Sequence, residues 1–244
     1  MGSKPKVFID GEAGTTGLGI RQRLEGLASI QLVSIAPERR KDAGARAEMY
    51  AEADLAILCL PDDAAREAVA LCETLGARAP RLLDASTAHR VHSDWVYGFP
   101  EMAPGQAKAI AEAKWVSNPG CYPTGSIALL RPLVEAGVIP RDFPITINAV
   151  SGYTGGGKAM IAEYEGAGAP SFDLYGLNLE HKHIPETHLY SGLTRRPIFV
   201  PSVGNYAQGM LVSIPLHLET LPGAPSGEDL HAVLAKAYAD SEFV

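Results

Sequence analysis

The chain has 244 residues, of which 46% are hydrophobic and 20% are charged, and its formal net charge is -7. This length can bury the core of one large domain or of two modest ones. Lysine and arginine do not cluster strongly, which disfavours nucleic acid as a partner because phosphate contacts need grouped cations. The longest apolar runs are strand-sized, so we expect no membrane-spanning helix and no membrane partner.

The three cysteines, Cys59, Cys72 and Cys121, form neither a CxxC pair nor a disulfide framework. No hydrophobic stretch typical of a signal peptide precedes the first apolar run. We therefore expect a reducing, cytoplasmic setting.

The first third of the chain alternates short apolar runs with helical patterns, which is typical of βαβ units around a parallel sheet. In chain order the patterns predict a strand at 6–9, a helix at 16–27, strands at 30–35 and 55–60, a helix at 63–75 and a strand at 81–84. On the first helix, Leu18, Ile20, Leu24 and Leu27 lie roughly on one side and are expected to pack on the sheet.

After about residue 115 the pattern changes, and we place a domain boundary near Ser117, with domains 1–117 and 118–244. A helix is predicted at 124–136, closed by Gly137. Strands are predicted at 145–151, 198–203 and 209–218, and a helix at 228–238. In the last of these strands apolar residues occupy alternate positions, which predicts a half-buried strand.

A glycine turn, Gly11-Glu-Ala-Gly14-Thr15-Thr16-Gly17, follows the first predicted strand and opens the first helix. Glycines at such a turn let the backbone approach a pyrophosphate, which binds the unpaired N–H groups of a helix N-terminus. The spacing G-x-x-G-x-x-G is less specific than G-x-G-x-x-G, so an ordinary glycine turn is the alternative. Its position in the first βα turn favours dinucleotide binding.

The end of the second predicted strand indicates which dinucleotide is bound. An NAD site usually places an acid there for the ribose hydroxyls, whereas this strand reaches Ser34 and is followed by Arg39 and Arg40. Arginine can hold a 2′-phosphate with two hydrogen bonds. We expect NADP (NADPH when reduced), the alternative being that these arginines form a solvated basic loop.

Cys121 follows the turn Asn118-Pro119-Gly120 and directly precedes a predicted helix. The dipole and free N–H groups of a helix N-terminus stabilise a thiolate, which predicts a nucleophile. The alternative, a small buried thiol, describes Cys59 and Cys72 better.

The segment 181–188 concentrates three of the seven histidines. It lacks the HExxH pattern, and Pro185 is expected to interrupt any helix that would align metal ligands, so no metal is expected. A general acid or base is the better interpretation of these histidines.

Gly152 to Lys158 matches G-x-x-x-x-G-K, but Ala159 replaces the Ser or Thr that binds magnesium, so we expect no NTPase site. The glycines and Lys158 could instead help to shape a pocket for an acyl phosphate.

Together these motifs resemble the short-chain (type 2) form of the N-acetyl-γ-glutamyl-phosphate reductases, in the aspartate-semialdehyde dehydrogenase-like superfamily. The matching segments are Phe8–Gly17, Cys59–Asp63, Asp84–Arg90, Tyr97–Glu101, Asn118–Thr124 and His181–His183. The string Asn-Pro-Gly-Cys-Tyr-Pro-Thr at 118–124 is the most specific of them.

The resemblance implies an α/β fold, with an N-terminal Rossmann domain followed by an α+β mixed-sheet catalytic domain, and it implies self-association. It also implies NADPH-dependent reduction of N-acetyl-glutamyl 5-phosphate to the 5-semialdehyde in arginine biosynthesis, through a thioester at Cys121 with His183 as acid/base. Pro61 and Ser86 are implied near the cofactor. His181 is the less favoured candidate for the acid/base, and Glu186 is a candidate to orient the histidine. Further candidates for substrate contacts are Arg90, Asn118, Lys158, His181 and Glu186.

The family normally continues into a further strand and a C-terminal helix that returns to the cofactor domain, whereas this sequence ends at Val244. We therefore expect that return segment to be absent here. Two alternative functions remain open: reduction of the aminoadipyl phosphate that is one methylene longer, and an inactive NADP-binding or redox-sensing relative.

Overall fold

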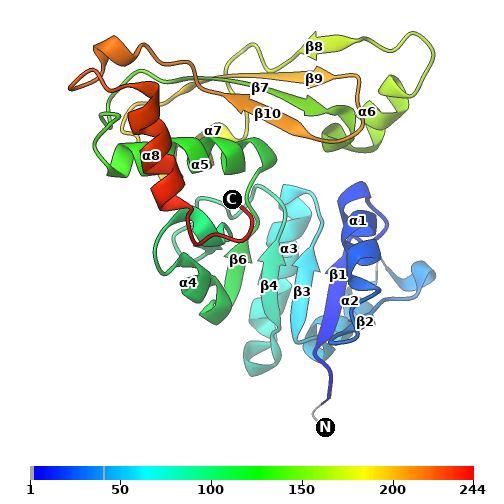
Figure 1. Cartoon of the computed structure of the whole chain (residues 1–244). Helices are drawn as coiled ribbons and strands as arrows, with labels where there is room; N and C mark the ends of the chain where they lie inside the picture. Colours follow the sequence, from blue (N-terminus) through cyan, green and yellow to red (C-terminus); the bar gives the residue numbers. More distant parts are fainter. Residues whose placement is uncertain (1–2, 41) are drawn as a thin grey trace. The chain divides into compact units, whose positions relative to one another are not determined.

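The computed structural model describes residues 3–40 and 42–244, which form two compact units (Figure 1). The first unit comprises the described residues up to Gly98 together with Lys108–Pro119. The second comprises Phe99–Ala107 and Gly120–Val244. The segment 99–107 therefore belongs to the second unit although it lies within the first in sequence, and the expected domain limits at residue 117 remain a proposal.

The first unit is built on a six-stranded parallel sheet with the strand order β2-β1-β3-β4-β6-β5. Its strands are β1 (Lys6–Asp10), β2 (Gln31–Val33), β3 (Leu55–Leu58), β4 (Arg81–Asp84), β5 (Val96–Tyr97) and β6 (Trp115–Ser117). The chain leaves β1 to one side for β2 and to the other side for β3. This reversal places a topological switch point at the carboxyl end of β1, where dinucleotides bind in such sheets.

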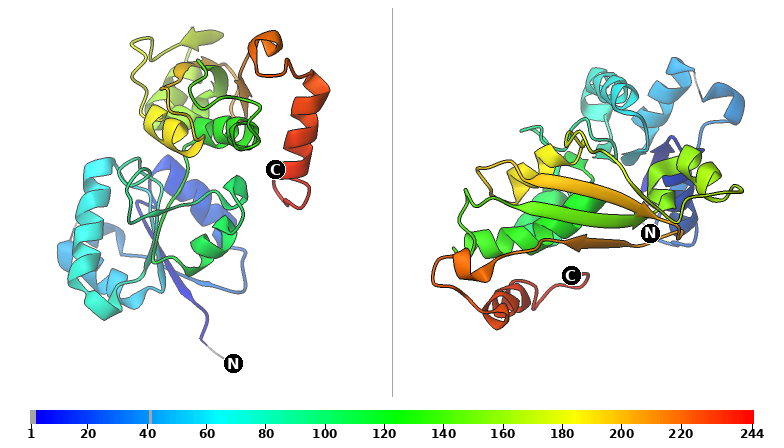
Figure 2. Two further views of the ribbon diagram at one scale, coloured as in Figure 1. Left: turned by 90° about the vertical axis from the view of Figure 1, so that its left-hand side faces the viewer. Right: turned by 90° about the horizontal axis from the view of Figure 1, so that it is seen from above.

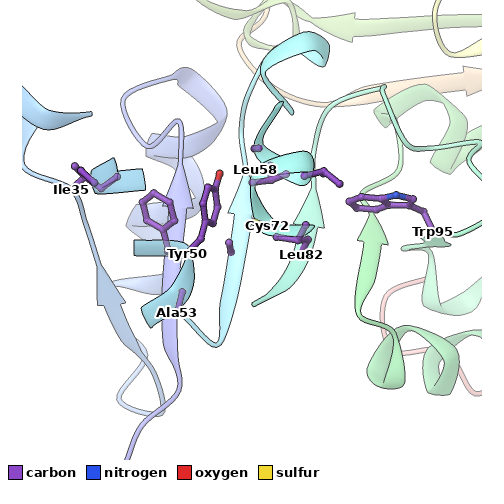
Figure 3. Close-up of a cluster of buried hydrophobic side chains, with 12 residues drawn as sticks. Ile35, Tyr50, Ala53, Leu58, Cys72, Leu82 and Trp95 are labelled. Atoms are coloured by element: carbon purple, nitrogen blue, oxygen red, sulfur yellow. The ribbon is translucent and has the colours of Figure 1, made fainter. Parts of the chain in front are cut away.

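Helices cover both faces of this sheet (Figure 2). They are α1 (Thr15–Leu24), α2 (Ala43–Glu52) and α3 (Asp62–Thr74), with α4 (Gln106–Glu112) leading into β6. Alternate residues of the strands supply the two faces, because successive side chains of a strand point in opposite directions. Figure 3 shows the core on the α2 and α3 side, where Tyr50, Leu58, Cys72 and Leu82 are buried together.

On the opposite face, Val7, Ile9 and Ile57 form a smaller core against α1. Ile20 and Leu24 of α1 pack on it as expected. The expectation for Leu18 and Leu27 was wrong, since they are 46% and 48% exposed. Leu27 lies beyond the end of α1 at Leu24, so the helical pattern no longer directs it toward the sheet.

The second unit has a four-stranded mixed sheet in the order β10-β7-β9-β8. Its strands are β7 (Thr146–Gly152), β8 (Phe172–Leu174), β9 (Ile198–Gly204) and β10 (Met210–Ser213), and only the β7–β9 pair is parallel. Its helices are α5 (Cys121–Glu135), α6 (Gly157–Tyr164), α7 (Ile184–Tyr190) and α8 (Gly227–Ala237). Seen from above, the strands lie in front of α5 (Figure 2, right). Ile147, Ala149 and Phe199 are buried on the side of this helix, in one core with Leu130 and Leu133.

Three sequence predictions need correction. The helix expected at 124–136 begins at Cys121, because Pro123 is tolerated in a first helical turn. The strand expected at 209–218 pairs only from Met210 to Ser213, shortly before Pro215, which has no N–H to donate. Pro185 does not interrupt a helix but occupies the first turn of α7. No helix within 3–40 and 42–244 is long and apolar enough to cross a membrane.

Candidate active site and cofactor site

The glycine turn after β1 is tight enough to require glycine at two of its positions. Gly11 has φ of +91°, and a Cβ there would lie 2.3 Å from the carbonyl oxygen of Cys59. A Cβ on Gly17 would lie 2.3 Å from the carbonyl oxygen of Gly11. The absence of side chains therefore brings β1, β3 and the start of α1 together and leaves the backbone open to a ligand.

Helix α1 begins at Thr15, one residue after Gly14, and no side chain caps its N-terminus. Thr15 and Thr16 stand in the first turn, where backbone N–H groups have no partner within the helix. Such a terminus is suited to a phosphate. The glycine cradle and this uncapped terminus fit the pyrophosphate of a nicotinamide dinucleotide.

A cavity of about 770 Å³ lies beside this turn and the end of β2, with Glu12, Arg21, Ser34 and Arg40 in its wall. The Glu12 carboxylate is the centre of this wall. It accepts hydrogen bonds from Arg21 Nη1 (2.7 Å), Ser34 Oγ (2.9 Å) and Arg40 Nη2 (3.0 Å). Arg21 Nη1 also lies 2.8 Å from Ser34 Oγ. One buried carboxylate thus binds two guanidinium groups and a hydroxyl at the edge of the cavity.

The sequence analysis named Arg39, Arg40 and Ser34 for this region and missed Arg21 and Glu12. Arg39 does not line the cavity; its Nη2 faces Asp42 at 3.9 Å and Glu48 at 3.7 Å. Arg21 was passed over because it lies on α1, well before the second strand. The one signal for it in the sequence is a cation on the helix that follows the glycine turn.

Pro61 and Ser86 follow the carboxyl ends of β3 and β4. Pro61 is the N-cap residue of α3. Ser86 is buried, and its main-chain N–H and its hydroxyl both donate to Asp84, at 2.9 and 2.7 Å. The fully buried Asp84 carboxylate also lies 2.6 Å from Nδ1 of His89. This network holds the backbone that follows β4 in one conformation.

Cys121 is the first residue of α5 and is exposed. Its N-cap residue, Gly120, has no side chain to bond the free N–H groups of the first turn. The other cysteines differ, since Cys59 is half-buried and Cys72 is buried. Of the three thiols, that of Cys121 is thus the one both accessible to a substrate and placed at the positive end of a helix dipole.

Glu186 ties the start of α5 to α7. Its side chain is 1% exposed, and its Oε2 accepts a hydrogen bond of 2.9 Å from the main-chain N–H of Gly120. Gly120 immediately precedes the cysteine, so this bond fixes the backbone on which Cys121 is carried. Local sequence patterns do not reveal this pairing, because the two residues are 66 positions apart.

The two histidines at 181 and 183 have different surroundings. His183 is buried and occupies the N-cap position of α7, where its side chain makes no capping hydrogen bond. His181 is half-buried, and its Nδ1 accepts the main-chain N–H of His183 at 3.1 Å. Burial, and secondly the nearby Lys182, lower the pKa of His181 below its ordinary value. His181 is thereby held as a neutral acceptor, which leaves His183 as the better candidate for proton transfer.

Tyr122, the second residue of α5, links this helix to the histidine pair. Its ring lies 5.9 Å from that of His183 and 6.1 Å from that of His181, measured between centroids. Its buried hydroxyl donates to Ser151 Oγ (2.9 Å) or to the carbonyl oxygen of Ser202 (3.0 Å). The start of α5 is therefore anchored both to α7 and to the sheet.

The remaining substrate candidates belong to other parts of the chain. Lys158 is exposed on α6. Asn118 is exposed, and its Nδ2 donates to the carbonyl oxygen of Pro119. Arg90 is buried, and its Nη2 lies 3.2 Å from the carbonyl oxygen of Ala85.

A Cβ on Gly152 would lie 2.6 Å from the carbonyl oxygens of Tyr206 and Ala207. The first glycine of the P-loop-like string therefore serves close backbone packing. The residues that the structure describes contain no group of three His, Cys, Asp or Glu side chains able to hold a metal ion.

Comparison with known proteins gives matches along nearly the whole chain. The family model for the semialdehyde dehydrogenase NAD binding domain matches residues 6–110, and that for the semialdehyde dehydrogenase dimerisation domain matches residues 121–244. N-acetyl-gamma-glutamyl-phosphate reductase from Chelativorans sp. (strain BNC1) is 59% identical over 239 residues, which is 97% of this chain and 76% of that protein. N-acetyl-gamma-glutamyl-phosphate reductase 2 from Nostoc sp. (strain PCC 7120) is 56% identical over 250 residues, covering 99% of this chain and 77% of that protein.

Among solved structures, aspartate semialdehyde dehydrogenase II from Vibrio cholerae matches with a TM-score of 0.70 at 15% identity. The match covers 96% of this chain and 79% of that chain. This likeness confirms the expected fold, a Rossmann-type parallel sheet followed by a mixed-sheet domain.

Proposed function

Because this chain belongs to the N-acetyl-gamma-glutamyl-phosphate reductase family of semialdehyde dehydrogenase-like proteins, we propose that it reduces N-acetyl-glutamyl 5-phosphate to N-acetyl-glutamate 5-semialdehyde, with release of phosphate. This reaction is a step of arginine biosynthesis. The observation that carries the proposal is the exposed thiol of Cys121 at the uncapped N-terminus of α5.

In this mechanism the Cys121 thiolate attacks the acyl carbon, and the C–O bond to phosphate breaks to leave a thioester. The nicotinamide cofactor, when bound, supplies the hydride that reduces the thioester carbonyl. The resulting thiohemiacetal collapses, which releases the semialdehyde and returns the thiolate. Covalent catalysis divides one difficult displacement into easier steps.

His183 is the residue to which we assign proton transfer. The thiohemiacetal oxygen must gain and lose a proton, and a positioned imidazole does this well near neutral pH. His181 has a different role in this proposal, since its Nδ1 already accepts the main-chain N–H of His183. Glu186 acts on the backbone, through Gly120, and Arg90, Asn118 and Lys158 stay proposals for binding the substrate's anionic groups.

The first unit is a nicotinamide dinucleotide-binding domain of the semialdehyde dehydrogenase type, and we propose NADP as its cofactor. The residue that follows β2 and lines the 770 Å³ cavity is Ser34 and not an acid. Arg21 and Arg40 line the same cavity. In this proposal the cofactor's pyrophosphate contacts Gly11, Gly14, Gly17 and the threonines between them.

The experiment that tests the proposal is turnover in reverse: N-acetyl-glutamate 5-semialdehyde, phosphate and NADP are mixed with the protein, and formation of NADPH is followed by absorbance. Wild-type protein should form NADPH only when phosphate is present. Cys121→Ser should bind NADP with unchanged affinity and form no NADPH. Substantial activity in Cys121→Ser would refute the thioester mechanism.

The same assay separates the alternatives. The semialdehyde of N-acetyl-aminoadipate differs by one methylene, which changes selectivity by only about 10- to 200-fold in an apolar pocket. A higher kcat/KM for that compound would assign the chain to the longer substrate. Binding of NADP without turnover of either compound would indicate an inactive or redox-sensing relative.

We also propose that the chain self-associates through the open face of the second unit's sheet. The register of the strands places Phe172, Leu174, Ile198 and Leu211 on the face opposite to α5, and their exposed fractions are 54%, 47%, 48% and 65%. A cluster of exposed apolar side chains is typical of an interaction surface. The match of residues 121–244 to a dimerisation domain supports a second copy as the partner. The three cysteines form no disulfide, which is compatible with the cytoplasm, and we propose this compartment.

A further inference from the structure

We propose that Arg21, on α1, is the residue that distinguishes NADP from NAD, by binding the adenosine 2′-phosphate together with Ser34 and Arg40. The inference rests on the proposed use of NADP and goes beyond it by naming the side chain that reads the phosphate. Arg39, which the sequence pattern favoured, has no part in it.

Side chains from three separate segments converge at the cavity beside the glycine turn. Arg21 comes from the second turn of α1, Ser34 from the segment after β2, and Arg40 from the 3-10 turn that follows, yet all three line one cavity. Their polar atoms meet at Glu12, which is itself only 9% exposed. The cavity lies beside the glycine turn, at the end of the sheet where a bound dinucleotide places its adenosine ribose.

The hydrogen-bond donors of Arg21 are used only in part by other described residues. A guanidinium group has five N–H donors. The hydrogen bonds of Arg21 to other described residues use Nη1, toward Glu12 and Ser34, and Nε, toward Glu25 Oε1 at 2.8 Å. The two Nη2 protons are left for a ligand. The Arg21 side chain is one-third exposed, and its bonds to Glu12, Ser34 and Glu25 hold it in place at the cavity.

The charge of the side chains that line the cavity also favours a phosphate. Two guanidinium groups near one another repel, and the Glu12 carboxylate between them offsets that repulsion in the protein without ligand. Among the side chains that line the cavity, Glu12, Arg21 and Arg40 together carry a formal charge of about +1. The Glu25 carboxylate, which also pairs with Arg21, does not line the cavity, and it is 54% exposed, so solvent screens its charge. This residual positive charge favours a phosphate, whereas the ribose hydroxyl of NAD gains little from it.

Arg39 provides the contrast within the same structure. It is 54% exposed and lies near Asp42 and Glu48, at 3.9 and 3.7 Å, outside the residues that line the cavity. Exposed pairs of this kind hold a side chain only weakly. Sequence proximity to the end of β2 therefore does not bring Arg39 to the cofactor.

The test compares Arg21→Gln with two matched controls, Arg39→Gln and Arg23→Gln; Arg23 is exposed on the same helix. Affinities are measured by titration calorimetry for NADP and NAD, and for adenosine 2′,5′-bisphosphate and adenosine 5′-monophosphate, which differ only in the 2′-phosphate. Arg21→Gln should weaken NADP and the bisphosphate about 10- to 100-fold, the usual effect of losing a charge-assisted hydrogen bond. NAD and the monophosphate should change less than about twofold on the same reasoning, and both controls should behave as the wild type.

Arg21→Lys keeps the charge but loses the planar fork, so its loss for the bisphosphate should be intermediate. Equal weakening of the bisphosphate and the monophosphate in Arg21→Gln would show a merely structural role and overturn the inference. So would an effect in Arg39→Gln as large as that in Arg21→Gln. Wild-type protein without any preference for NADP would refute the proposed cofactor and this inference together, whereas a preference that Arg21→Gln retains would refute this inference alone.

Discussion

The three cysteines illustrate how strongly the surroundings of a single residue decide its chemistry. Burial, and secondly the charge of Asp10, raise the pKa of Cys59 to about 11 and that of Cys72 to about 12. Both thiols therefore stay protonated near neutral pH. Cys121 is exposed at the start of a helix, where a thiolate is stabilised.

This contrast predicts the order of alkylation. Treatment with iodoacetamide at neutral pH should label Cys121 first, because the thiolate is the reacting form and the other two thiols are protonated and covered. Peptide mass spectrometry after brief exposure measures the order. Saturating acyl phosphate should protect Cys121 and leave the slow labelling of Cys59 unchanged. Labelling of Cys72 before Cys121 would contradict the assignment of the nucleophile.

The two neighbouring histidines should also respond differently to the same substitution. His183→Asn should lower kcat by roughly 10²- to 10⁴-fold, the usual contribution of a positioned acid or base. His181→Asn should cost much less, because His181 acts as an acceptor for a main-chain N–H and Asn can accept in its place. Steady-state kinetics with both variants measure the difference, and iodoacetamide labelling of Cys121 serves as the control for an intact site. A larger loss in His181→Asn would exchange the two roles.

At the scale of elements, the junction of α5 and α7 carries the proposed catalytic side chains. Cys121 begins one helix and His183 directly precedes the other, so a shift between the helices would separate them. Pro185 in the first turn of α7 favours the start of the helix at this point, since its fixed φ suits a first turn and its missing N–H costs nothing there. The buried bond from Gly120 N–H to Glu186 joins the two N-termini.

Removing this bond should destabilise the second unit. Glu186→Ala leaves the buried Gly120 N–H without its acceptor, which should lower the free energy of unfolding by about 1–3 kcal/mol. Glu186→Gln can still accept through its side-chain oxygen and should lose less. Urea unfolding followed by circular dichroism measures both. The matched control is Glu219→Ala, at a side chain that is 75% exposed, and it should leave stability unchanged. Equal stability of Glu186→Ala and wild type would mean that the bond is not formed in solution.

For the whole molecule, the open sheet face of Phe172, Leu174, Ile198 and Leu211 is the surface that we expect to be covered in the assembled protein. Figure 1 shows α5 and α7 on the other side of this sheet. Leu211 is the most exposed of the four, at 65%, and its neighbour across the strands is Val150. A charge placed there would have to be desolvated in an interface.

Leu211→Lys should therefore shift the protein toward the monomer while leaving the fold intact. Sedimentation velocity across a range of protein concentrations measures the state, and circular dichroism checks the fold. Leu177→Lys is the matched control, because Leu177 is 62% exposed but lies in the loop after β8. A monomeric wild-type protein, or equal effects of both substitutions, would refute this face as the interface.

Much of the fold could be predicted from the sequence because the signals were local. The helix expected at 228–238 is observed at Gly227–Ala237, where Ser226 and Asp229 form a capping box. Gly137 has φ of +71° and ends α5 as expected. The alternation of half-buried Val212, Ile214 and Leu216 with exposed residues continues beyond the paired part of β10. Hydrophobic period, turn residues and caps act over a few positions, so a single sequence reveals them.

The amino-acid sequence by itself thus determined the βαβ order of the first unit, the glycine turn, and a cysteine at the start of a helix. Only the tertiary structure decided which distant side chains meet. Glu12 and Arg40 are 28 positions apart, and Gly120 and Glu186 are 66 positions apart. The same is true of Phe99–Ala107, whose place in the second unit follows no local pattern. The physical reason is that helices and turns are specified by neighbours along the chain, whereas a pocket is specified by packing among elements that the sequence does not place side by side.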